Sequence, residues 1–182
     1  MRTLLIFALL TLSACKRAPE LQRFGQVPPF ELVSQTGQKT TLADLKGHVW
    51  VADAIFTNCQ GPCPMMTSKM RGVAKEVESL ADVRIVSLTV DPEHDSPEVL
   101  TAYAKEFQAK PAQWLFLTGA KEVLNQVSQD GLHLSKVDGS LEHGTRFALV
   151  DKTGEVRGYY RPFEKAEMKK LVSDIRDLAE QR

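Results

Sequence analysis

Two long runs of apolar, β-type residues, with a helical pattern between them, most constrain what this chain can fold into. Residues Val49–Phe56 and Val83–Val90 are almost continuously apolar, as expected for strands buried on both faces of a sheet. Between the two runs, Met66, Met70 and Val73 recur at helical spacing. This alternation of strand, helix and strand is typical of a parallel sheet covered by helices. It predicts an α/β fold.

The remainder of the chain supplies further elements around this unit. One hairpin is expected from Phe30–Val33 and Lys39–Leu42, and a second from Arg146–Val150 and Val156–Tyr160. The other expected elements are a short connector at 43–46, a helix at 64–80, a helix at 97–107 with Ser96 as its N-cap, a strand at 114–117, and helices at 121–128 and 165–178. Together they predict a central mixed sheet flanked by helices, with an N-terminal β-hairpin.

The N-terminus predicts export and a lipid anchor. A basic start is followed by apolar residues 4–12, which are too few to span a hydrocarbon layer of about 30 Å as a helix. The run ends in Leu12-Ser13-Ala14-Cys15, which resembles the lipobox of bacterial lipoproteins; the alternative is an ordinary signal peptide with an unrelated cysteine. We expect a signal peptide at 1–14, a lipidated Cys15 with a tether at 15–29, and one domain at 30–182, held outside the cytoplasm on a bacterial membrane.

The charge balance excludes one class of partner. The chain has 23 basic and 23 acidic side chains, and removal of Arg2 with the signal peptide leaves this balance almost unchanged. There is no positive field to attract nucleic acid. A polyanionic partner is therefore not expected, and we expect a monomer.

Two cysteines are the expected working site. The chain has three cysteines, and Cys15 lies in the targeting segment, so the folded domain must use Cys59 and Cys63. They lie directly after the strand at 49–56 and at the start of the next helix. At such a position the helix dipole favours a thiolate, and we expect the sulfurs to be accessible. The pair can be a staple, a redox couple or half of a metal site.

The metal hypothesis needs a third ligand. There is no second cysteine pair and no pair of histidines with zinc-site spacing, which argues against a four-ligand zinc cage. Thiolates suit copper, above all Cu(I), and a histidine would complete a trigonal site. His94, His133 and His143 compete for this role, whereas His48 lies at the opposite end of the cysteine strand. His143 lies beside the cysteines if the strand at 146–150 runs antiparallel to theirs.

Three motifs carry a resemblance to a known family. The runs Phe56-Thr57-x-Cys59-x-x-x-Cys63-Pro64 and Asp91-Pro92-x-x-Asp95-x-Pro97, and the pair Glu142-His143, resemble the SCO/SenC family of thioredoxin-fold copper proteins over residues 24–178. The resemblance implies a thioredoxin-like fold and copper, as Cu(I) or Cu(II), held by Cys59, Cys63 and His143. It also implies delivery to the binuclear copper centre of cytochrome c oxidase. The chain departs from the family pattern at two places. Glu142 stands where the family usually has aspartate, and the residues between the cysteines, Gln60-Gly61-Pro62, are not the usual ones.

A thiol-disulfide oxidoreductase is the alternative function. Such enzymes typically have two residues between their cysteines and a cis-proline near the site, whereas this chain has three residues between Cys59 and Cys63 and no proline from Gly131 to Arg161. This favours metal binding. The two functions can also coexist, because a Cys59–Cys63 disulfide would expel Cu(I). Of the nearby methionines, Met65 is expected to be exposed, and Met66 and Met70 to belong to the core.

Overall fold

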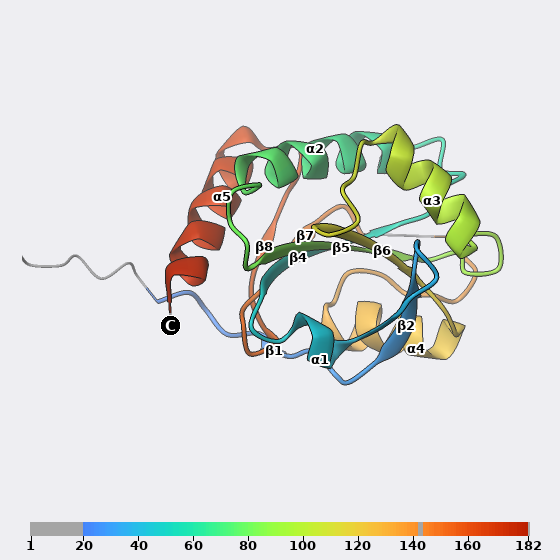
Figure 1. Cartoon of the computed structure of the whole chain (residues 1–182), viewed down its shortest axis with the longest axis horizontal. Helices are drawn as coiled ribbons and strands as arrows, with labels where there is room; N and C mark the ends of the chain where they lie inside the picture. Colours follow the sequence, from blue (N-terminus) through green and yellow to red (C-terminus); the bar gives the residue numbers. More distant parts are fainter. Residues whose placement is uncertain (1–19, 142–143, 182) are drawn as a thin grey trace, which may run out of the picture.

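A computed structural model describes residues 20–141 and 144–181 of the chain. Its sheet has eight strands in the order β1-β8-β7-β4-β5-β6-β2-β3 (Figure 1). The strands are β1 (Gly25–Gln26), β2 (Glu31–Ser34), β3 (Lys39–Thr41), β4 (Val49–Ile55), β5 (Val83–Thr89), β6 (Trp114–Thr118), β7 (Phe147–Val150) and β8 (Glu155–Tyr160). The helices are α1 (Leu42–Leu45), α2 (Cys63–Glu76), α3 (Pro97–Glu106), α4 (Lys121–Asn125), the π-helical turn η1 (Gln126–Gly131) and α5 (Lys165–Glu180).

The central strands confirm the mixed sheet expected from the sequence. β4 pairs in parallel with β5, and β5 pairs in parallel with β6, whereas β7 runs antiparallel to β4. Every residue of β4 is buried, because helices cover both faces of the sheet. The two expected hairpins are also present, as β2–β3 and β7–β8.

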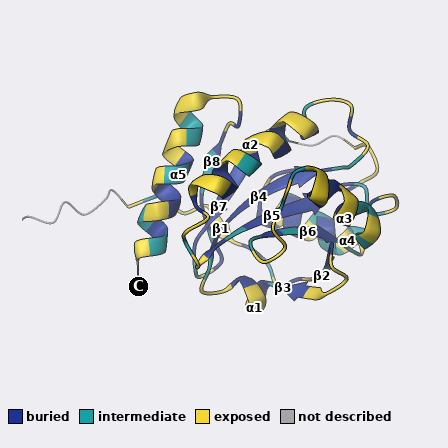
Figure 2. Cartoon of the chain, turned by 45° about the horizontal axis from the view of Figure 1, so that its top comes forward, coloured by how far each residue is buried: buried dark blue, intermediate teal, exposed yellow. Residues whose placement is uncertain are grey.

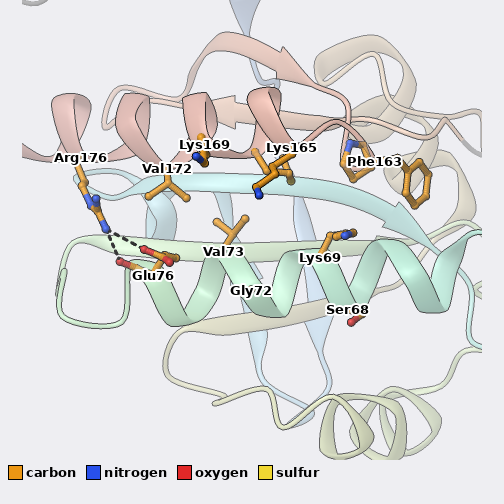
Figure 3. A pocket seen from close by; sticks show the side chains of 12 residues that line it. Ser68, Lys69, Gly72, Val73, Glu76, Phe163, Lys165, Lys169, Val172 and Arg176 are labelled. Carbon is orange, nitrogen blue, oxygen red and sulfur yellow. Dashed lines mark hydrogen bonds and ion pairs between the residues drawn. The ribbon is translucent and has the colours of Figure 1, made fainter.

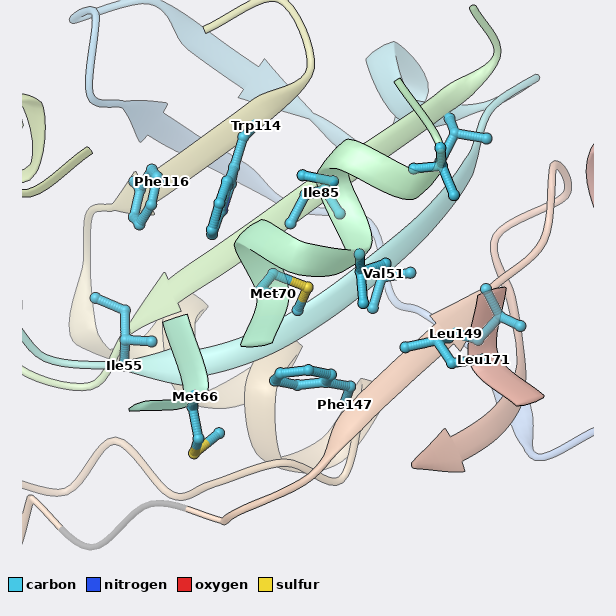
Figure 4. Packing of buried hydrophobic residues seen from close by; sticks show 14 of the residues in the cluster. Val51, Ile55, Met66, Met70, Ile85, Trp114, Phe116, Phe147, Leu149 and Leu171 are labelled. Atoms are coloured by element: carbon cyan, nitrogen blue, oxygen red, sulfur yellow. The ribbon is translucent and has the colours of Figure 1, made fainter. Parts of the chain in front are cut away.

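Two apolar clusters fill the layers on either side of the sheet. α2, α3 and α5 lie over one face, and α1 and α4 lie under the other (Figure 1). The helices turn their buried sides toward the sheet (Figure 2). The first cluster, under α2, includes Met66, Met70, Trp114, Phe116 and Phe147, all at most 1% exposed (Figure 4). This cluster forms the floor beneath the cysteine loop.

Helix α2 begins as expected but ends earlier. Pro62 is its N-cap and Pro64 lies in its first turn, where a missing N–H leaves no hydrogen bond unmade. The expectation that the helix continues to Leu80 is wrong, because it ends at Glu76 and residues 77–79 form turns. Val77 is fully buried. The apolar pattern from which the helix was predicted therefore continues through the turn, beyond the end of the helix.

Three other expectations need correction. Part of the predicted tether at 15–29 belongs to the sheet, because β1 pairs with β8 and the Phe24 N–H donates to the Val156 carbonyl at 2.9 Å. Residues 43–45 of the expected connector belong to the short helix α1, which begins with a capping box between Thr41 and Asp44, and Lys46 is its C-cap. The helix expected at 121–128 changes into the π-helical turn after Asn125. Within the described ranges, no helix is long and apolar enough to cross a membrane.

Candidate metal centre

The two cysteines lie together at the carboxyl end of β4. Hydrogen bonds shape their loop: the Cys59 N–H donates to the Phe56 carbonyl at 3.3 Å, and the Gly61 N–H donates to Cys59 Sγ at 3.4 Å. The thiols of Cys59 and Cys63 share a hydrogen bond and are not joined in a disulfide. The sulfurs are therefore close enough to bind one metal ion or to form a disulfide with each other.

The cysteine site is less accessible than the sequence predicted. Cys59 is 9% exposed and Cys63 is fully buried. Burial raises the pKa of the Cys63 thiol well above its ordinary value, and contact with Cys59 and the charge of Asp53 act in the same direction, against a backbone hydrogen bond at Phe56. The expectation that the helix start favours a thiolate is wrong for Cys63, because the loss of water outweighs the helix dipole.

Asp53 is a buried acid that sequence analysis missed. It lies two residues from both Val51 and Ile55 on β4, so its side chain shares their face of the sheet, toward α2, and it is fully buried. Oδ1 accepts a hydrogen bond from Ser87 Oγ at 2.6 Å, whereas Oδ2 has no hydrogen-bond partner among the described residues. Burial raises the pKa of Asp53 to about 7. An acid within the apolar run at 49–56 was the signal that could have identified it.

Asp95 fastens the cysteine loop to the end of β5. Its buried carboxylate accepts hydrogen bonds from the Thr57 N–H at 3.2 Å, from Thr57 Oγ1 at 2.6 Å and from Thr89 Oγ1. Thr57 lies two residues before Cys59, so this contact fixes the start of the loop. The N-cap of α3 is Ser96, as expected from the sequence, so Asp95 serves the cysteine loop and not the helix cap.

His94 lies beside the cysteine loop, but hydrogen bonds occupy its ring. Asn58 Nδ2 is 2.9 Å from His94 Nε2, and His94 Nδ1 is 3.2 Å from Asp95 Oδ1. An amide nitrogen only donates, so His94 Nε2 accepts the hydrogen bond from Asn58, and the ring proton is on Nδ1. Both ring nitrogens therefore have hydrogen-bond partners, and binding a metal through Nε2 would require the loss of the hydrogen bond from Asn58.

His48 and His133 lie away from the cysteine pair. His48 precedes β4, seven strand residues before the cysteine end, which corresponds to roughly 23 Å. His133 is exposed and its Nδ1 lies 3.0 Å from the Gln129 carbonyl oxygen. Leu132 and Leu134 beside it belong to the cluster under the opposite face of the sheet. Neither histidine is a candidate for the third ligand.

The antiparallel pairing of β7 with β4 brings the chain before β7 to the cysteine end of the sheet. Ala148 pairs with Ala52, so β7 begins where β4 ends, as the sequence argument for His143 required. His143 and Glu142 themselves lie outside the described residues, as does Cys15. Next to them, the Gly144 N–H donates to Ser135 Oγ at 2.6 Å. A Cβ on Gly144 would lie 2.3 Å from the Leu134 carbonyl oxygen, so only glycine fits.

The described residues do not complete a metal site by themselves. Within 20–141 and 144–181, no group of three or more His, Cys, Asp and Glu side chains is placed to hold a metal ion. Cys59 and Cys63 supply two soft donors, and a third donor must come from elsewhere. Met66 and Met70 are buried core residues, as predicted, and Met65 is 58% exposed.

The sequence and fold of this chain match one family of proteins. A SCO1/SenC sequence profile matches residues 18–180. The chain belongs to the SCO1/SenC family. A solved SCO1/SenC family lipoprotein from Bacillus anthracis is 37% identical to it, with a TM-score of 0.77 over 85% of this chain and 95% of that one. This confirms the family and the thioredoxin-like fold expected from the sequence.

Two further solved structures of Sco proteins are similar to this chain. BsSco, described as having a disulfide switch and as a member of the Sco family of cytochrome c oxidase assembly proteins, is 31% identical, with a TM-score of 0.78 over 90% of this chain and 99% of its own. Yeast Sco1 with copper bound is 25% identical, with a TM-score of 0.68 over 88% of this chain and 100% of its own.

Proposed function

We propose that this SCO1/SenC protein is a copper metallochaperone in which Cys59, Cys63 and His143 bind one copper ion, as Cu(I) or Cu(II). The observation that carries the proposal is the meeting of two chain segments. The hydrogen-bonded thiols lie at the carboxyl end of β4, and the antiparallel β7 begins at that same end. Two sulfurs and one imidazole nitrogen form a donor set that suits copper, and yeast Sco1 is a relative with copper bound.

The burial of the site supports a metal cargo. Copper binds thiolates, so binding displaces the thiol protons. Asp53 and the two sulfurs lie in one buried region, and no positive charge is among the causes that set the Cys63 pKa. A copper cation would supply that positive charge.

The client of this copper is proposed to be a respiratory cytochrome c oxidase. The protein would deliver copper to the oxidase copper centre, or prepare that centre to receive it. The support is family membership, together with BsSco's description as one of a family of oxidase assembly proteins. The direct measurement is transfer of copper from the loaded protein to the purified, metal-free copper domain of the oxidase.

The location is proposed from the N-terminus. Residues 1–14 would be removed as a signal peptide, and Cys15 would carry the lipid that holds the domain of residues 30–182 outside the cytoplasm, as a monomer facing the periplasm. A SCO1/SenC family lipoprotein is among its solved relatives. Mass spectrometry of the membrane-extracted protein should find an acylated Cys15 at the N-terminus, and Cys15→Ser should release the protein from the membrane.

Copper titration of the reduced protein tests the site. The wild type should take up one copper ion per chain, and Cys59→Ser, Cys63→Ser and His143→Ala should each weaken binding sharply. A Cu(II) complex should also show thiolate charge-transfer absorption that the cysteine variants lose. His133→Ala is the matched control, because His133 is exposed and lies by the opposite cluster. No copper uptake would exclude the chaperone function, and normal uptake by the double cysteine variant would exclude the site.

A thiol-disulfide oxidoreductase remains the second candidate. The hydrogen bond between the thiols of Cys59 and Cys63 favours it, because the sulfurs need little movement to form a disulfide. The test is reduction of a model disulfide by the metal-free dithiol. Rapid turnover that is undiminished in His143→Ala would make oxidoreductase the primary function.

A further inference from the structure

A groove between α2 and α5 has no role in the site described above. Its volume is about 670 Å³, and it extends along both helices (Figure 3). Along α2 it is lined from Ser68 to Glu76, and the second helix contributes residues from Lys165 to Arg176. The α2 side is about 12 Å long at 1.5 Å per residue, or two helical turns.

The floor of the groove is apolar. Val73 and Val172 point toward each other between the helices (Figure 3), with Met168 also in the lining. Phe163 stands at one end and is 48% exposed. An exposed aromatic ring at the end of a recessed apolar surface is typical of a site that receives a large apolar side chain.

The rim of the groove is basic. Lys69, Lys165 and Lys169 line it, and none of them has an ion pair with a described residue. Arg176 also lines it and pairs with Glu76 at 3.2 Å, and Glu76 is the acid in the lining. Because the whole chain carries equal numbers of basic and acidic side chains, this excess of positive charge is local.

Gly72 leaves the middle of the groove open. It lies in the interior of α2, where glycine is disfavoured relative to alanine. A Cβ at this position would meet nothing within 4 Å, so the packing of the protein itself does not require a glycine. A close approach by another chain would require one.

We propose that this groove is a docking site for an acidic segment of a partner protein that carries apolar anchor residues. Carboxylates would pair with the three lysines while the anchors fill the space between Val73 and Val172. A flat anionic bilayer would leave this recessed floor unfilled. The chain's own N-terminal segment carries Lys16 and Arg17, which the basic rim would repel.

The groove would hold its partner near the cysteines. Lys69 is six residues after Cys63 on the same helix, about 9 Å along its axis. Docking in this groove does not require copper at the cysteines, so a failure of copper binding and a failure of docking would be observed separately.

The test uses the full-length protein in neutral detergent and a fluorescent peptide of about 12 residues, with Glu and Leu at helical spacing. The peptide should bind and shift the backbone amide resonances of α2 and α5. Reversing the three groove lysines, as Lys69→Glu, Lys165→Glu and Lys169→Glu, should weaken binding about tenfold or more, with a strong dependence on salt. The matched control reverses Lys46, Lys105 and Lys136, which are also exposed and lie outside the groove.

Filling the groove tests the floor separately from the charge. Gly72→Leu should block the peptide, whereas Gly72→Ala should keep the fold and reduce binding less. The proposal is overturned if the peptide does not bind, if its Lys-for-Glu counterpart binds equally, or if both triple variants behave alike. It is also overturned if the groove lysines instead govern binding to phosphatidylglycerol vesicles, or if the groove mediates self-association in sedimentation.

Discussion

Replacing Asp53 by asparagine should change how the stability of the protein depends on pH. Asp53 is fully buried, and burial raises its pKa from 3.8 to about 7. As pH rises from about 4 to 7, the unfolded chain ionises this carboxyl while the folded chain keeps it protonated, so stability falls. At 1.36 kcal/mol per pKa unit the full effect is about 4 kcal/mol, and about 3 kcal/mol of it falls between pH 4.5 and 8.

The asparagine side chain in the variant cannot ionise. Its amide brings two N–H donors to the position where protonated Asp53 has one unpaired O–H at most, which costs roughly 1–3 kcal/mol. Asp53→Asn should therefore be less stable than the wild type at pH 4.5 and more stable at pH 8. Urea unfolding followed by circular dichroism, with reduced thiols and a chelator present, measures both free energies. Asp82→Asn, at an exposed carboxyl, is the control and should show no such reversal. If the difference between wild type and Asp53→Asn is the same at both pH values, the carboxyl does not titrate as its burial requires.

Two substitutions and one reactivity measurement test the loop and its surroundings. Asp95→Asn should destabilise the protein by roughly 2–4 kcal/mol in urea unfolding, because an amide nitrogen cannot accept the hydrogen bonds from Thr57 and Thr89; an effect below about 1 kcal/mol would contradict this. Gly144→Ala should cost roughly 1–3 kcal/mol and weaken copper binding, since its Cβ would lie 2.3 Å from a backbone oxygen; unchanged thermal unfolding would refute the clash. Cys63 in the metal-free protein should react with iodoacetamide at pH 8 more slowly than a cysteine in an unstructured peptide, because its pKa is raised, and faster alkylation would contradict the effect of burial.

The sequence predicted those parts of the fold that depend on continuous local patterns. β4 and β5 are each seven residues long and almost entirely buried, so their apolar runs were unambiguous. By contrast, β1 has only two residues, too few to carry an alternation, and its pairing with β8 depends on the finished sheet. The end of α2 was missed for a related reason, since buried Val77 prolongs the helical stripe into a turn.

The candidate site was predictable in its residues but not in its electrostatics. Two cysteines after a buried strand locate the site, and the antiparallel β7 supports the choice of the segment that contains His143. The helix dipole is a local feature, so sequence reasoning applied it to the thiols. Burial is a tertiary feature and acts on Cys63 in the opposite direction. The contacts of Asp53 with Ser87 and of Asp95 with Thr57 join residues 34 and 38 positions apart, which no local pattern reveals.

The raised pKa of Cys63 bears on the choice between the two candidate functions. A thiol-disulfide oxidoreductase needs a thiolate as its attacking group, and its site normally stabilises that thiolate with nearby positive charge or a helix start. Here burial, Cys59 and Asp53 all raise the pKa of Cys63, so Cys63 is a poor nucleophile in the metal-free protein. Two of these influences, the charge of Asp53 and the nearby sulfur of Cys59, also favour an incoming cation, which would take the place of the thiol protons. The electrostatics therefore favour a site that works when a metal ion is bound, which is the reason to rank copper binding above dithiol chemistry for this pair.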